Sequence, residues 1–138
     1  MNVPAALNAI DLLLKNDGEV YASVNGRIDY ARGAVSRVWP LITYFEVSAN
    51  TAYVADYDRI IVQCSIWAES PFVALDIASK VEKLLRRFRG PIVTPRGTVD
   101  INWTSLVDAG ALPQADERLF GQFLRYEIRY RGQNLGGV

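Results

Sequence analysis

The chain has 138 residues, half of them hydrophobic, with 15 basic and 15 acidic side chains and a formal net charge of zero. This length allows a core that needs no disulfide or metal, so we expect a single domain over residues 1–138. The balanced charge excludes a disordered composition and gives no sign of a nucleic-acid or membrane surface. Apolar runs are too short to cross a bilayer, and no signal-like segment is seen, so we expect a protein kept in the cytoplasm.

Residue types restrict the chemistry further. The chain contains no histidine, which removes Ser-His and Cys-His catalysis and nearly every common zinc arrangement. The single cysteine, Cys64, lies on the apolar side of a predicted strand, where we expect a small buried hydrophobe rather than a reactive thiol. We therefore predict no catalytic residue, no metal site and no cofactor. Any enzyme chemistry would have to rest on carboxylates, tyrosine, lysine or arginine.

The first predicted element is a helix over residues 4–16, where leucine and isoleucine recur at helical spacing before an Asp-Gly pair ends the pattern. Residues 20–38 are mixed and show no clear period. Strands are predicted over residues 41–47 and 58–67, where apolar and polar residues alternate. The polar loop between them, residues 48–56, is short, so antiparallel pairing of the two strands is the simplest connection.

The second strand runs into a helix at Ala68-Glu69-Ser70-Pro71, a type of junction that can hold a phosphate or a catalytic serine. This turn has no glycine and carries an acid, which disfavours a phosphate. Ser70 also lacks the glycines of a nucleophile elbow. We therefore predict that Ser70 caps a helix that begins at Pro71 and ends in an arginine-rich turn.

Beyond this helix a Gly-Pro pair breaks the chain, and a short strand is predicted over residues 99–103. Residues 105–118 are predicted to be a loop, residues 120–131 a last strand, and residues from about 132 a flexible C-terminal tail. Two helices and four to five strands with short connections indicate an α+β fold. Its sheet is expected to be mainly antiparallel, with both helices packed on one face.

Arginine outnumbers lysine twelve to three, and arginine is enriched at protein interfaces because its planar fork pairs with carboxylates and stacks on rings. One cluster closes the long helix, where cations also meet the negative end of the helix dipole. The other lies on one side of the last strand, where a solvated sheet face explains it equally well. The candidate subunit or partner interface consists of six residues: Arg86, Arg87, Arg89, Arg125, Arg129 and Arg131.

The run ITYFEVSANTAYVADYDRIIVQCSIWAESPFVALDIASKVEKLL, residues 42–85, resembles the tail-terminator family of long-tailed bacteriophages, also called tail-completion or tail-to-head joining proteins. The final strand fits that family more loosely, and residues 93–118 match nothing in it. The matching elements are the helix over residues 7–14, Gly26-Arg27, the strand start at residues 40–44, the run VQCSIWAES at residues 62–70 and the helix over residues 74–85.

This resemblance implies a structural virion protein without enzymatic activity, located at the head-proximal end of the tail and assembled in the host cytoplasm. Copies of the chain would form a homo-oligomeric ring, typically a hexamer, that ends polymerisation of the tail tube and forms the joint to the head-neck. The implied partners are the chain itself, the tail tube protein and a neck or connector protein. No membrane and no sequence-specific nucleic acid is expected as a partner.

Other functions stay open at this point. The nearest is another head-tail connector or neck subunit. A small cytoplasmic enzyme with carboxylate or tyrosine chemistry would show a deep pocket with convergent acids or tyrosines. A single-strand nucleic-acid binder with an aromatic sheet face would bind more weakly as salt rises.

Overall fold

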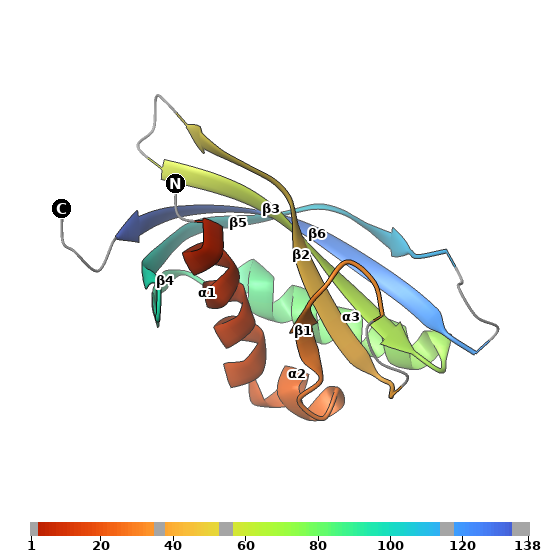
Figure 1. Cartoon of the computed structure of the whole chain (residues 1–138). Coiled ribbons are helices and arrows are strands. Elements are labelled where there is room, and N and C mark those ends of the chain that lie inside the picture. The colour runs from red at the N-terminus through yellow and green to blue at the C-terminus, as the bar shows by residue number, and fades with distance from the viewer. Residues whose placement is uncertain (1–2, 35–37, 53–56, 114–117, 134–138) are drawn as a thin grey trace.

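The structure of the protein is a computed structural model that describes residues 3–34, 38–52, 57–113 and 118–133. Within these residues a six-stranded sheet carries three helices on one of its faces, which gives two layers (Figure 1). The elements in chain order are α1 (Val3–Asn16), α2 (Gly18–Ser23), β1 (Ile28–Tyr30), β2 (Leu41–Ala52), β3 (Tyr57–Ala68), α3 (Pro71–Arg87), β4 (Gly90–Thr94), β5 (Gly97–Ala111) and β6 (Phe120–Gln133).

The strands lie in the order β1-β2-β3-β6-β5-β4. All neighbours are antiparallel except β1, which runs parallel to β2. The α+β class, the mainly antiparallel sheet and the pairing of β2 with β3 are confirmed. The predicted numbers of two helices and four to five strands are wrong, because α2, β1 and β4 are six, three and five residues long. Segments this short hardly display a hydrophobic period.

Two strand boundaries differ from the prediction. Residues 105–111 were predicted as loop but belong to β5, whose pairing with β6 is interrupted between Ile101 and Trp103 and again between Leu106 and Asp108. Similarly, β2 continues to Ala52, past an irregularity after Glu46. A bulge shifts the side-chain alternation by one residue, so the period-two pattern is lost although the strand continues.

β6 continues to Gln133, so the tail predicted from about residue 132 falls almost wholly on residues that the structure does not describe. Residues 134–138 lie outside the described residues. The junction between β3 and α3 is as predicted in position, with Ser70 at the N-cap and Pro71 in the first turn. The Ser70 side chain makes no capping hydrogen bond, and its carbonyl accepts from the Ala74 N–H at 3.1 Å.

The main core lies between the helices and one face of the sheet. The inward stripes of α1 and α3 consist of small and aliphatic residues, and they pack on buried side chains of β2, β3, β5 and β6. Tyr44 of β2 donates a hydrogen bond to Asp11 Oδ1 of α1 at 2.9 Å, which ties this helix to the sheet. No helix of the described residues is long and apolar enough to cross a membrane.

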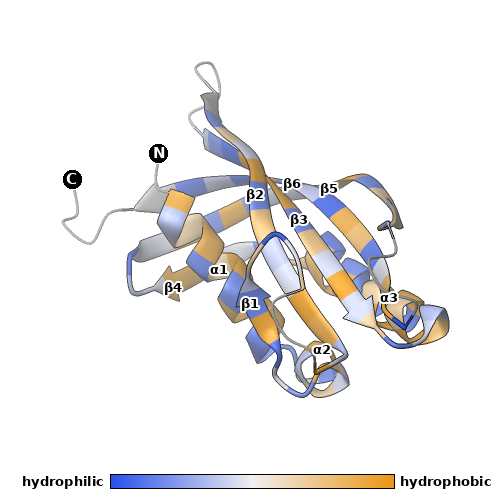
Figure 2. Ribbon diagram, turned by 45° about the vertical axis from the view of Figure 1, so that its right-hand side comes forward, coloured by the Kyte–Doolittle hydropathy of each residue, from blue (hydrophilic) through white to orange (hydrophobic). Residues whose placement is uncertain are grey.

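A second, smaller cluster lies on the other face of the sheet. Leu41, Trp67 and Leu119 are buried there, with Trp39 and Leu112 packed against them. The neighbouring chain segments thus cover this face near the start of β2 and the end of β3. The rest of the face carries no helix, and the alternation of hydropathy along the strands is visible in Figure 2.

Candidate functional site

The helix-free face of the sheet carries one of the two predicted arginine clusters. Alternate residues of β6, from Leu124 to Tyr130, are buried under the helices. The intervening residues therefore point to the opposite side. Arg125, Arg129 and Arg131 share this side, as the alternation in the sequence predicted.

Two of these arginines lie over aromatic rings. The Arg125 guanidinium lies 4.5 Å from the centroid of the Phe123 ring and binds Asp108 Oδ2 at 2.7 Å. Arg129 lies 5.3 Å from the ring centroids of both Tyr57 and Trp103. Cation–π contact and ion pairing restrict the side chains to one arrangement, so both arginines are presented in an ordered form.

Glu127 lies at the centre of this arrangement and neutralises two cations. Its side chain is 16% exposed and is 3.2 Å from both Arg59 Nη1 and Arg129 Nη2. Arg131, in contrast, is exposed and has no hydrogen bond or ion pair with the described residues. We call this surface the arginine face: Tyr57, Arg59, Trp103, Phe123, Arg125, Glu127, Arg129 and Arg131.

Most partners of these arginines could not be identified from the sequence. Alternation along β3 placed Arg59 on the polar side of its strand, but only the register brings it opposite Arg129, which in turn lies opposite Trp103. Asp108 was assigned to a loop and is a strand residue opposite Arg125. A correct strand pairing would have found these contacts, because cross-strand neighbours on one face touch.

The second predicted cluster, at the end of α3, does not form one surface. Arg86 makes an ion pair with Glu82, one helical turn earlier, at 2.6 Å. Arg89 donates to Thr104 Oγ1 of β5 at 2.8 Å and joins the end of the helix to the sheet. Of the three arginines, Arg87 alone lines the groove beside α2. The cluster is thus divided among three local roles.

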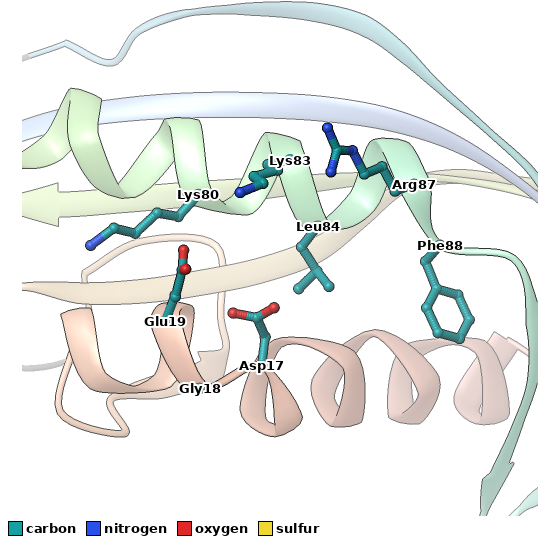
Figure 3. Close-up of a pocket in the computed structure, with 8 residues that line it drawn as sticks. All are labelled: Asp17, Gly18, Glu19, Lys80, Lys83, Leu84, Arg87 and Phe88. Carbon is teal, nitrogen blue, oxygen red and sulfur yellow. The ribbon is translucent and has the colours of Figure 1, made fainter.

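That groove, of about 560 Å³, lies between α2 and α3. Lys80 of α3 points toward Glu19 across it, and Leu84 and Phe88 form its apolar part (Figure 3). Asp17 also caps α2, accepting the Val20 N–H at 3.0 Å. The cations lining it are Lys80, Lys83 and Arg87. Among the described residues no group of three histidine, cysteine, aspartate or glutamate side chains could hold a metal.

Cys64 is 1% exposed, and burial raises the pKa of its thiol to about 12. The thiolate is the nucleophilic form of cysteine, so this side chain is inert near neutral pH. The prediction of a small buried hydrophobe is confirmed. Burial also raises the pKa of both Tyr126 and Tyr130 to about 12.

These pKa values predict a loss of stability at alkaline pH. The unfolded chain releases the Cys64 proton near the ordinary pKa of 9.0, whereas the folded chain keeps it to about pH 12. The unfolded state therefore binds fewer protons in this interval, and the free energy of unfolding falls by up to about 1.4 kcal/mol per pH unit. Urea unfolding between pH 8 and 9, where tyrosines of the unfolded chain with their ordinary pKa of 10.0 are still mostly protonated, measures this slope. Cys64→Ala should flatten it, and equal slopes would contradict the assignment.

Comparison with known proteins finds similarity at the level of structure. No protein-family model matches the sequence, and no curated protein sequence matches it. A chain from the solved structure described as "Virion of native gene transfer agent (GTA) particle" superposes with a TM-score of 0.70 and 17% sequence identity. The match covers 90% of the present chain and 92% of the virion chain. The two chains share a fold over nearly their whole lengths.

Proposed function

We propose that this chain is a structural subunit of a phage-like virion and acts as a tail terminator. Copies of it form a ring on the head-proximal end of the tail tube, a hexamer as is typical of the family that its sequence resembles. The ring ends polymerisation of the tube and forms the joint to the neck. The observation that carries this proposal is the shared fold with a chain of a gene transfer agent virion, which spans nearly all of both chains.

The surface chemistry agrees with an assembly role. An ordered array of arginines on aromatic rings loses little conformational entropy when a partner binds, and arginine and aromatic residues are common at the centres of interfaces. The arginine face has these properties and lies on the side of the sheet that carries no helix. The same face could meet another copy of the chain or the tube.

The first test is the mass of the purified protein in solution by light scattering, with negative-stain imaging of the same fraction. We expect a closed ring of about six subunits, since head-to-tail contacts between identical subunits close into rings. A protein that is both monomeric in solution and absent from the particles would overturn the proposal.

Immunogold labelling of particles produced by cells that carry the gene tests the location. We expect label at the junction of head and tail, and on the head-proximal end of tails detached from their heads. Label that stays on the detached heads would identify a neck or connector subunit instead. Label along the tail or on the capsid surface would contradict both assignments.

A further inference from the structure

The outward side of α3 is divided into two parts of different character. Its first turns, together with Glu69 two positions before Pro71, expose large apolar side chains and two acids, whereas its later turns expose lysine and arginine. The turn of α3 next to the end of β3 is accordingly hydrophobic in Figure 2. We call the first part the acidic-apolar end of α3: Glu69, Phe72, Val73, Leu75 and Asp76.

Phe72 is 77% exposed, and Val73 and Leu75 are 41% and 48% exposed. A helix that packs on a sheet needs one apolar stripe, and α3 already has a buried one on its inner side. The outward apolar residues thus contribute nothing to the core of the subunit. A contiguous exposed apolar patch with a charged rim marks an interaction surface.

The charge of this patch is entirely negative. Glu69 and Asp76 are exposed and have no hydrogen bond or ion pair with the described residues. On the arginine face, four arginines stand against three carboxylates of the same side of the sheet, Asp100, Asp108 and Glu127. Arg131 lies opposite Asp100 in the register but makes no hydrogen bond or ion pair with the described residues, and Trp103, which lies opposite Arg129, is 45% exposed.

We propose that the acidic-apolar end of α3 in one copy docks on the arginine face of the next copy. Apolar residues around Phe72 would cover Trp103, and the unpaired acids would meet Arg131. α3 packs on the helix-covered face of the sheet, whereas the arginine face lies on the helix-free face. The contact therefore joins two different surfaces of neighbouring copies. Such a contact propagates head to tail and closes into a ring when its rotation allows. This inference rests on the proposed function and identifies the contact that builds the ring.

Charge exchange tests the pairing, and circular dichroism of each variant checks that the fold is kept. Arg131→Glu alone, or Glu69→Arg with Asp76→Arg, should raise the concentration for half-assembly by about tenfold or more, because like charges would then oppose each other. Combining the three substitutions should restore most of the assembly. Lys83→Glu, on the basic part of α3, is the matched control and should leave assembly unchanged.

Arg125 and Arg129 are unsuitable for this test. Each already pairs with a carboxylate of its own subunit, so reversal would oppose two negative charges within one chain and destabilise the fold. Glu69 and Asp76 make no ion pair with the described residues and can be reversed cleanly. Arg131 makes none either, but it lies opposite Asp100, so Arg131→Gln, which removes the charge without opposing two acids, is measured beside Arg131→Glu.

Cross-linking gives an independent measurement. Cys64 is buried, so a maleimide reagent would react with introduced surface thiols in preference to it. Ser79 is exposed one turn after the acidic-apolar end, and Asn102 is exposed beside Trp103. A chain carrying both Ser79→Cys and Asn102→Cys should give a ladder of cross-linked species with a flexible bismaleimide. The controls are the double variant Asn16→Cys with Asn102→Cys and each single variant, and none of them should give a ladder.

Cross-linking is carried out on the purified protein and on isolated tails. The second sample detects the contact even if the chain forms a ring only on the tail tube. A ring that forms normally in the reversed variants and gives no ladder overturns the docking, while the proposed function stands. A further outcome is that the variants form a normal ring that no longer attaches to tails. This result would assign the arginine face to the tube protein, and it would also overturn the docking between copies. Absence of the chain from particles would instead refute the proposed function.

Discussion

Replacing Trp67 with alanine should lower the free energy of unfolding by about 3–5 kcal/mol, the usual cost of removing a large buried aromatic side chain. Trp67 is 8% exposed and packs with Leu41 and Leu119 in the small cluster on the helix-free face. Gly121 lies directly beside the ring, since a Cβ built there would be 3.0 Å from Trp67. The ring therefore fills a space that the surrounding backbone cannot easily close.

Urea unfolding followed by circular dichroism measures this loss, and Trp67→Phe is the matched control. The control keeps an aromatic ring and loses the hydrogen bond from the indole N–H to Thr43 Oγ1, which is 3.2 Å long. It should cost about 1–2 kcal/mol. Equal losses for alanine and phenylalanine would show that the hydrogen bond, rather than packing of the cluster, accounts for the stability.

Leu14→Ala should cost about 2–5 kcal/mol, because Leu14 is fully buried where α1 packs on the sheet. The higher helix propensity of alanine offsets only a few tenths of a kcal/mol of this loss. Leu12, on the same helix, is only partly buried and makes a matched control. Leu12→Ala should lower the free energy of unfolding by clearly less than Leu14→Ala does.

Hydrogen exchange of the α1 amides would complement the denaturation measurement. If α1 unfolds together with the sheet, Leu14→Ala should raise exchange throughout both layers. Faster exchange confined to α1 would show that this helix opens separately. In that case the loss of global stability would be smaller than expected.

The two faces of the sheet divide structural and assembly roles in this interpretation. The helices and the inner face supply the core, so substitutions such as Leu14→Ala act on stability. Glu69, Asp76 and Arg131 make no hydrogen bond or ion pair with the described residues, so reversing these charges should act on assembly far more than on stability. Comparing unfolding and assembly for the same variants separates these effects.

The fold class and the longer elements could be predicted from the sequence because their patterns are local. The stripe of α1, the alternation of β3 and the Ser70-Pro71 start of α3 depend on neighbouring residues. The buried state of Cys64 followed from the same alternation. The short elements were missed because β1 is held by hydrogen bonds to β2 rather than by a pattern of its own.

The sequence by itself determined that Arg125, Arg129 and Arg131 share one side of β6, since side chains alternate along any strand. Only the tertiary structure decided which residues surround them, because cross-strand register brings Arg59, Asp108 and Trp103 to that side from distant parts of the chain. The exposure of Phe72 was likewise decided by packing. An amphipathic pattern shows where apolar residues lie on α3, and the sheet selects which of them are covered.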